Sequence, residues 1–575
     1  MTKSILSARG RFVIYNLLIV GAILAIYGGL VYHPFHTFDD PGYVTDNYYV
    51  QNGLTFEGCA WAFRSVDVAN WHPLTWLSHM TDVEVFGPNP AGHYLTNILL
   101  HVASSLLLFW LVWRVGGNEQ MGFVVALIWA VHPANVECVA WIAERKSLLA
   151  TVFMLAGMIS YHRYCQGGSR CYYLLSIVAH LLASMAKPIA VLFPVALVLI
   201  ESFSAFRDGV SPTEGLRRSW RTELSKARGW LLIIFREKTP FIAISGYLAI
   251  LTFIAQDEGG ATAFTYSSRF LWRCGNALEA LWWYTAKSFS MSESSLLYVL
   301  EPLDGLVVFL GGLLVLLMVL CAIACFREKR VVSIGLAWYL LMFLPTIGIV
   351  QVGSQRMADR YLGWPLIGLI CVVCYGVTMA FRCCNSRVLP VIALGAWAIG
   401  LGWQTRALCV DWEDDLRLSR NAIFVGGYSP AMLNNCAVLE VQRHDFQTAR
   451  RYLAAKADRG SPSLNIAIID LDEKKYKDAI AEARRISRDK KDRLMAAGVA
   501  GQAFDRLNMP YEARRAYMTA IDWLPTERSY KLSVERLRFI LPGLAAAAAA
   551  REEDLIAGKE PDIRWRTKGR MELSR

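Results

Sequence analysis

Uninterrupted apolar runs dominate the chain before Gln404. Runs such as 12–31 and 303–326 are each long enough to cross a hydrocarbon layer, which takes about 20 helical residues. Lipid offers the backbone no hydrogen-bond partner, so such runs are helices or closed-barrel strands, and their lack of alternation excludes the barrel. We therefore predict eleven membrane-spanning helices, at residues 12–31, 95–115, 121–138, 148–165, 172–186, 188–203, 239–256, 303–326, 331–350, 361–381 and 388–404.

One further apolar segment, 268–290, is interrupted by three charged residues. Counting it as a span would move the basic stretch 327–330 to the other side of the membrane, against the preference of basic loops for the cytoplasm. We therefore predict an outer-surface or re-entrant helix, with Trp282, Trp283 and Tyr284 at the membrane interface.

Lys and Arg gather in alternate loops, before the first span and within 207–228, 327–330 and 382–387. This pattern predicts a cytoplasmic N-terminus and an extracytoplasmic C-terminus. It also accounts for the formal net charge of +11, and because no nucleic-acid-binding motif occurs, nucleic acid is not an expected partner. The first run follows basic residues as a signal peptide does, but it is long and has no small-residue cleavage site, so we expect an uncleaved helix.

Cysteine and histidine spacing predicts no metal site and no obligate cofactor. The 13 cysteines lie mostly in apolar runs or beside basic loops, and the one CxxC, Cys371–Cys374, has no second ligand pair. Five histidines lie in the first outer loop, 32–94, without the HxxxH or HExxH spacing. A metal there is the minor alternative to structural histidines.

The composition becomes charged and helix-forming after Gln404. Three stretches share an aromatic residue and a later alanine, at Phe446 and Ala449, Tyr476 and Ala479, and Tyr511 and Ala513, with spacings near the period of about 34 residues of tetratricopeptide repeats. We predict a transmembrane domain at 1–404, a connector at 405–428, a short α-solenoid at 429–545 and a charged tail at 546–575. The fold class is therefore all-α.

Two adjacent carboxylates, Asp39 and Asp40, follow the first span directly. Two neighbouring carboxylates can have different roles: one accepts a proton, while the other orients a donor or raises its neighbour's pKa. The same Asp-Asp-Pro-Gly stretch also suits a solvated turn. Both interpretations stay open from spacing alone.

The outer membrane face gathers ionisable residues at the ends of the predicted spans, where they are costly unless they face a cavity or one another. A mixture of carboxylates and cations suits a phosphate-bearing lipid donor, because the departing phosphate needs cationic partners. The candidate cations are Arg145, Lys146, Lys187, Arg356 and Arg360. The supporting candidates are His72, His79, Asp82, His132, Glu137, Glu144, Asp359 and Tyr361.

Five segments occur in a fixed order before the repeats: FDDPGYVTDNYYVQNGLT, WHPLTWLSHMTD, HPANVECVAWIAERKS, MAKPIAVLFPVALVLIES and QRMADRYLGWPLIGL. Together they resemble the transmembrane and tetratricopeptide-repeat O-mannosyltransferase family and its bacterial relatives, over residues of about 12–530. That family belongs to the GT-C glycosyltransferases, which take a sugar from a polyprenyl-phosphate carrier.

The resemblance implies residue roles. Its acidic motif falls on Asp39 and Asp40, with Asp39 favoured as the residue that activates the acceptor hydroxyl. Its Glu-Arg-Lys motif falls on Glu144, Arg145 and Lys146, and its Arg-Tyr motif on Arg360 and Tyr361. The chain departs from the family pattern at two positions, Ser147 in place of aspartate and Gly363 in place of tyrosine.

The expected function is an inverting transfer of a sugar from polyprenyl phosphate to a protein hydroxyl on the extracytoplasmic face, with the repeats binding the acceptor protein. Two alternatives stay open: the same donor with a glycan or lipid acceptor, and a non-catalytic membrane scaffold or transporter. We expect a bacterial inner-membrane protein with periplasmic active site and repeats.

Overall fold

The computed structural model describes residues 7–207, 220–258, 270–349, 355–382, 386, 388–457, 464–486, 493–513 and 515–516. Regular structure in these ranges is helical, and the sole extended pairing there is an isolated bridge between Val299 and Gln355. The predicted all-α class is confirmed. The chain divides into two compact units, residues 1–427 and 428–575, which are described separately.

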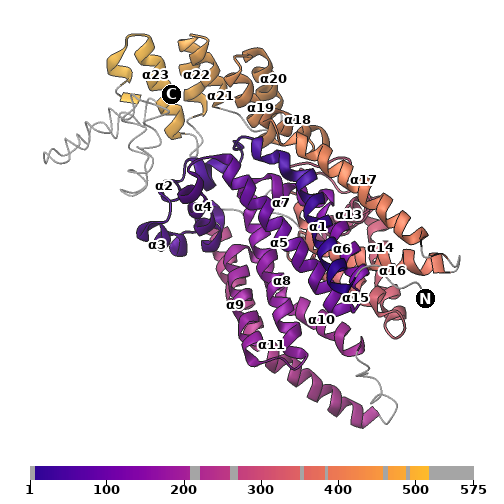
Figure 1. Ribbon diagram of the computed structural model, residues 1–575. Helices are drawn as coiled ribbons and strands as arrows, with labels where there is room; N and C mark the ends of the chain where they lie inside the picture. Colours follow the sequence, from indigo (N-terminus) through magenta and orange to yellow (C-terminus); the bar gives the residue numbers. More distant parts are fainter. Residues whose placement is uncertain are drawn as a thin grey trace. The chain divides into compact units, whose positions relative to one another are not determined.

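The first unit is a helical bundle whose long helices α5, α8 and α9 run side by side (Figure 1). Its helices are α1 (Ala8–Tyr27), α2 (Tyr48–Gln51), α3 (Phe56–Arg64), α4 (Pro73–Phe86), α5 (Pro90–Gly116), α6 (Glu119–Ala130), α7 (Val136–Ala140), α8 (Arg145–Cys165), α9 (Arg170–Ala186), α10 (Phe193–Arg207), α11 (Trp220–Glu258), α13 (Phe270–Lys287), α14 (Gly305–Cys325), α15 (Arg330–Leu341), α16 (Gly363–Arg382), α17 (Leu389–Asp411) and α18 (Asp415–Gly426).

Short helical turns join these helices: η1 (Gly28–Tyr32), η2 (Pro41–Thr45), η3 (Asp67–Ala69), η4 (Pro133–Asn135), η5 (Ile142–Glu144), η6 (Pro188–Leu192) and η7 (Asp359–Tyr361). Most of them lie where the predicted outer loops fall.

Five helices in the described ranges are long and apolar enough to cross a membrane, and a bent pair, Glu119–Ala130 with Pro133–Ala140, makes a sixth if it is one span. The five are Arg9–Tyr32, Pro90–Gly116, Glu237–Asp257, Gly305–Cys325 and Gly363–Arg382. These helices make the chain an integral membrane protein. Each of the eleven predicted spans overlaps a helix or bent pair, but helix α15 ends at Leu341 and so covers little more than half of the predicted span 331–350. Helices α9 and α15 and the stretch Pro188–Ser204 are apolar helices shorter than 18 residues. The number of spans therefore stays a prediction.

The ambiguous segment forms α13, which packs closely against α14. Gly311 of α14 faces the carbonyl of Leu278 so closely that a Cβ atom there would overlap it. Along α13, Asn276 donates to the Arg356 carbonyl and Lys287 pairs with Asp359. The helix therefore lies along the segment that precedes α16, at the end of the bundle where α16 begins.

The first outer loop is itself largely helical. Helix α4 begins with Pro73, which suits a first helical turn, and stops at Gly87, whose φ of +67° glycine adopts without strain. Helices α2, α3 and α4 group together at one end of the bundle (Figure 1).

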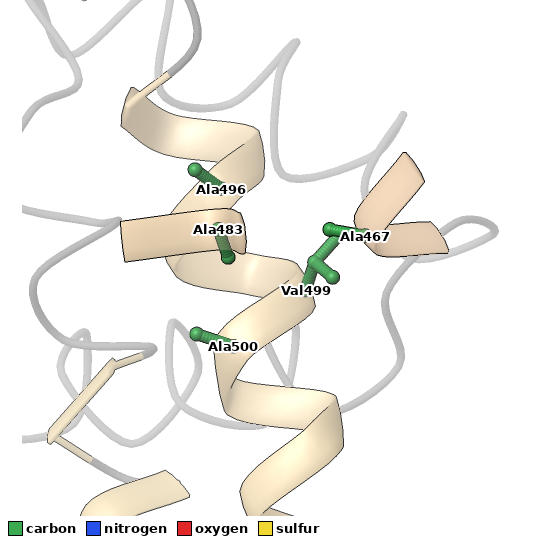
Figure 2. Packing of buried hydrophobic residues seen from close by; sticks show 5 residues of the cluster. All are labelled: Ala467, Ala483, Ala496, Val499 and Ala500. Atoms are coloured by element: carbon green, nitrogen blue, oxygen red, sulfur yellow. The ribbon is translucent and has the colours of Figure 1, made fainter. Parts of the chain in front are cut away.

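The second unit is built from paired helices: α19 (Pro430–Gln442), α20 (Phe446–Ala457), α21 (Asn465–Asp472), α22 (Tyr476–Ile486) and α23 (Arg493–Arg506). Small residues let them pack closely: Ala467 of α21, Ala483 of α22 and Ala496, Val499 and Ala500 of α23 form one cluster (Figure 2).

The predicted repeat positions have a common geometry in this unit. Ala449, Ala479 and Ala513 are buried, as expected for the small residue at which paired helices approach. Each lies five residues after a left-handed turn residue, at His444, Lys474 and Asn508. The tetratricopeptide assignment itself stays a prediction, and the predicted end of the third repeat and the tail lie outside the described residues.

Candidate active site

Four separate segments of the first unit meet at one end of the bundle. The loop after α1 supplies Asp39, the start of α8 supplies Lys146, the link between α9 and η6 supplies Lys187, and η7 supplies Arg360. Helices α1 and α9 end where α8 and α16 begin. This alternation of direction brings together residues that lie more than 300 positions apart in the chain.

Glu144 is the centre of this cluster. Its buried carboxylate contacts three cations: Lys187 Nζ at 2.7 Å, Lys146 Nζ at 3.2 Å and Arg360 Nε at 3.5 Å. Burial alone would raise the pKa of Glu144, but the three cations hold it well below its ordinary range. Glu144 is therefore an anion that holds three cationic groups around one point.

A second carboxylate fixes Arg360. Glu137 Oε2 accepts a hydrogen bond from the Arg360 backbone N–H at 2.9 Å and one from its guanidinium Nη1 at 3.3 Å. The guanidinium also lies 5.4 Å from the centre of the Trp141 ring, a cation–π distance. With Asp39 counted, the cluster holds three carboxylates and three cations.

Tyr43 completes the cluster and was not a candidate from sequence. Its hydroxyl accepts a hydrogen bond from Lys146 Nζ at 2.9 Å. The imidazole of His72 stacks on its ring with the planes 5° apart. In the sequence, Tyr43 is marked only by its position in the acidic segment, because the histidine that stacks on it comes from another part of the loop.

Asp39 lies near Lys146 and Arg360, whose charges act on it, and its contacts differ from those of Glu144 and Glu137. It is half-buried, and within the described ranges its carboxylate makes no hydrogen bond or ion pair. Burial raises the pKa of Asp39, and the charge of Lys146 opposes that rise. A partly desolvated carboxylate with free lone pairs has the properties of a general base.

Asp40 is buried completely, and both of its carboxylate oxygens are hydrogen-bonded. It accepts hydrogen bonds from the backbone N–H groups of His36 at 2.9 Å and Ala143 at 3.0 Å. Burial raises its pKa to about 6. These contacts tie the first outer loop to the turn before α8, so the geometry gives Asp40 a structural role and leaves Asp39 as the candidate base.

Arg145 points away from the cluster, although it lies between Glu144 and Lys146 in the sequence. Its fully buried guanidinium pairs with Asp82 at 2.5 Å, donates to Asn97 at 2.8 Å and donates to the His93 carbonyl at 2.8 Å. Every contact of this group is internal. The geometry therefore does not support the predicted phosphate contact of Arg145, nor a place for Asp82 in the cluster.

Arg356 also lies apart from the three cations, since it pairs with Glu279 of α13. Asp359 accepts hydrogen bonds from Tyr298 and Ser294, both at 2.8 Å, and pairs with Lys287. The Tyr361 hydroxyl accepts from Gln355 at 2.6 Å. These contacts hold η7, and with it Arg360, against α13 and the chain that follows it.

The candidate histidines have mainly structural contacts. His132 has both ring nitrogens engaged, with Ser288 O at 3.1 Å from Nε2 and Ala134 N–H donating to Nδ1 at 3.1 Å. His79 is buried beside His93, and burial holds its pKa well below the ordinary value. Across the described ranges no three His, Cys, Asp or Glu side chains form a metal-binding group.

Comparison with known proteins gives a consistent set of relatives. Protein O-mannosyl-transferase Tmtc1 of Drosophila melanogaster is 33% identical over 123 residues, which are 21% of this chain and 14% of the relative. Human protein O-mannosyl-transferase TMTC4 is 24% identical over 467 residues, which are 71% of this chain and 61% of the relative. No family model matches the chain.

The chain resembles the TMTC O-mannosyltransferases. The resemblance expected from its motifs is thus confirmed. The chain spans less than two thirds of the length of these curated relatives.

One departure from the TMTC pattern lies within the cluster. Where that pattern has aspartate, Ser147 donates to Glu144 Oε2 at 2.6 Å and accepts from Lys187 Nζ at 2.6 Å. The hydroxyl bridges anion and cation without adding a negative charge. The second departure, Gly363, accepts a hydrogen bond from the Trp129 indole through its carbonyl at 2.8 Å.

Proposed function

We propose that this protein is a GT-C glycosyltransferase that moves mannose from a polyprenyl-phosphate carrier to a hydroxyl group of an acceptor protein, with inversion at the anomeric carbon. The observation that carries the proposal is a carboxylate with free lone pairs, Asp39, near Lys146 and Arg360, two of the three cations that Glu144 gathers. The names of the TMTC relatives support the sugar and the protein acceptor.

The reaction divides between the two parts of the site. Asp39 accepts the proton of the acceptor hydroxyl, and the oxygen attacks the anomeric carbon. The bond between that carbon and the phosphate oxygen breaks, and the polyprenyl phosphate leaves with the electron pair. Lys146, Lys187 and Arg360 stabilise the charge that develops on the phosphate, which is the usual role of preorganised cations.

The orientation that fits this reaction places the Asp39 end of the bundle outside the cytoplasm and the N-terminus inside, in a bacterial inner membrane. The distribution of basic loops supports this orientation. Single cysteines introduced near residues 220 and 470 should react with a membrane-impermeant maleimide from opposite sides of the membrane. Labelling of both from one side would contradict the orientation.

The test of function is mannose transfer from a synthetic polyprenyl-phosphate mannose to a serine- and threonine-rich peptide by the purified protein. Asp39→Asn keeps the size of the side chain but removes its basicity, so turnover should fall about 10²- to 10⁴-fold. Asp46→Asn is the matched control, because Asp46 is an exposed carboxylate of the same loop that contacts Thr45.

Asp40→Asn separates chemistry from structure. An amide cannot accept both backbone hydrogen bonds in place of the carboxylate, so this variant should lose thermal stability and lose less turnover per folded molecule than Asp39→Asn. Near-normal turnover in Asp39→Asn would exclude that residue as the base. Transfer of mannose to a lipid or glycan, without transfer to the peptide, would support the proposed donor and contradict the proposed protein acceptor.

A further inference from the structure

Helix α18 contacts the first outer loop through its first residue, Asp415. The Asp415 carboxylate accepts one hydrogen bond from His36 Nδ1 at 2.6 Å and another from the Thr37 backbone N–H at 2.9 Å. The His36 ring is buried and lies edge-to-face against Trp412, with the ring centres 5.3 Å apart. His36 and Asp415 lie 379 positions apart in the chain, so this link joins a distant helix to the backbone just before Asp39.

The position of the Asp39 side chain depends on this link. Among the described residues, the Asp39 carboxylate makes no hydrogen bond or ion pair, so no contact of its own fixes it. Its backbone is held instead. On one side Thr37 is bonded to Asp415, and on the other Asp40 accepts two hydrogen bonds. The Tyr43 N–H also donates to the Asp39 carbonyl at 3.1 Å.

Helix α18 is itself fixed to the chain that joins α13 to α14. The Asn421 side chain donates to the Ser294 carbonyl at 3.0 Å, and the Gly426 carbonyl accepts from the Val299 N–H at 2.9 Å. A Cβ atom at Gly426 would overlap the Leu297 carbonyl, so the two backbones are in direct contact. The helix and this chain therefore form one rigid support.

The same chain holds Arg360. Ser294 and Tyr298 each donate to Asp359 at 2.8 Å, and the Tyr298 carbonyl accepts from the Arg356 N–H at 2.8 Å. Asp359 and Arg360 are neighbours in η7. Helix α18 thus contacts the loop of the candidate base at its first residue and the support of Arg360 further along.

We propose that α18 sets the position of Asp39 relative to Arg360, which makes Asp415 a positioning residue of the transfer reaction. The inference rests on the proposed function. Inversion requires the base and the phosphate-binding cations on opposite sides of the anomeric carbon, and a misplacement of about 1 Å can cost about 10²-fold in rate. The predicted connector, 405–428, therefore contributes to the geometry of the active site.

The experiment compares mannose transfer and donor binding in variants of the purified full-length chain. Asp415→Asn has one oxygen and cannot accept both hydrogen bonds, so kcat should fall about 10- to 100-fold. Donor affinity, measured by titration with polyprenyl-phosphate mannose, should stay that of the unaltered protein, because Lys146, Lys187 and Arg360 keep their contacts with Glu144.

The decisive readout is the double variant with Asp39→Asn. If Asp415 acts through Asp39, adding Asp415→Asn to Asp39→Asn should cause little further loss of kcat, because the base is already absent. Full multiplication of the two losses would assign Asp415 to general stability and overturn the proposal. Near-normal kcat in Asp415→Asn, with the large loss in Asp39→Asn preserved, would also overturn it. Near-normal kcat in Asp39→Asn would contradict the proposed function itself.

Two further variants complete the test. His36→Phe keeps a ring against Trp412 but removes the donor to Asp415, so it should show the same fall in kcat at unchanged donor affinity. It replaces Asp415→Asn if that variant does not fold, as thermal unfolding reports. Glu413→Gln is the control, since it removes an exposed carboxylate two residues earlier and should leave kcat unchanged. An equal loss in the control would overturn the specific role of Asp415.

Discussion

At the scale of single residues, side chains that are adjacent in the sequence make contacts in different parts of the structure. Asp39 keeps its lone pairs free near Lys146 and Arg360, whereas Asp40 accepts hydrogen bonds from two backbone N–H groups. Likewise Lys146 faces the cluster, whereas Arg145 is held inside by Asp82. Adjacent residues of a turn or helix start point in different directions, so one motif supplies both the chemistry and its support.

The pH dependence of transfer follows from the charges around Asp39. A general base must be ionised, so kcat/KM should rise with pH through the Asp39 pKa, which burial raises above the value of an exposed aspartate. Lys146 lowers that pKa, so Lys146→Met should raise it further and move the acid limb of the pH–rate profile to higher pH.

Lys187→Met is the comparison for that profile. Lys187 contacts Glu144 and Ser147 and is not among the charges that shift the Asp39 pKa. Its loss should weaken donor binding about 10-fold or more while the acid limb stays in place. The same displacement in both variants, or none in Lys146→Met, would remove Asp39 as the titrating base.

At the scale of elements, α13 shows how charges are accommodated in an apolar helix. Its charged residues all have partners: Arg273 donates to the Ile349 carbonyl, Glu279 pairs with Arg356, and Lys287 pairs with Asp359. Each partner lies far along the chain. The helix therefore braces η7 and Arg360, a role that its own sequence does not reveal.

The close packing of α13 on α14 gives a matched pair of glycine substitutions. A Cβ atom at Gly311 would overlap the Leu278 carbonyl, whereas one at Gly312 would lie 3.7 Å from Leu278 Cδ1, an ordinary contact. Gly311→Ala should therefore destabilise the protein by about 1–3 kcal/mol. Gly312→Ala should leave thermal unfolding in detergent nearly unchanged. Equal unfolding temperatures for the two variants would contradict this packing.

At the scale of the whole molecule, the chain separates a membrane unit from a unit of paired helices. The proposed base and cations all lie in the first unit. The helices of the second unit pack through small residues into clusters of their own, one of which is drawn in Figure 2. Under the proposed function, donor chemistry belongs to the first unit, and we propose acceptor binding for the second because stacked helix pairs form extended binding surfaces.

Truncation tests that division. A chain that ends at Gly427 should bind polyprenyl-phosphate mannose as the full chain does, because the cluster is intact, but should transfer less mannose to a folded protein acceptor. Donor binding is measured by titration in detergent, and a short peptide acceptor is the control. Undiminished transfer to the protein acceptor would assign acceptor recognition to the first unit.

The sequence alone determined the elements and their chemistry. Apolar runs of membrane length dictate helices because lipid satisfies no backbone hydrogen bond, and residue types at the ends of those runs indicated an anion site. The repeated alanines likewise predicted close helix pairs. These features depend on local composition and spacing, which a sequence displays directly.

Only the tertiary structure decided which candidates act together. Glu144 gathers Lys146, Lys187 and Arg360 from three separate segments, and Tyr43 joins them although no motif marked it. Side-chain direction and distant ion-pair partners depend on how helices pack against one another, and a local pattern does not contain that information. For the same reason the sequence grouped Arg145 with Lys146, whereas packing turned the two cations to opposite sides of the helix start.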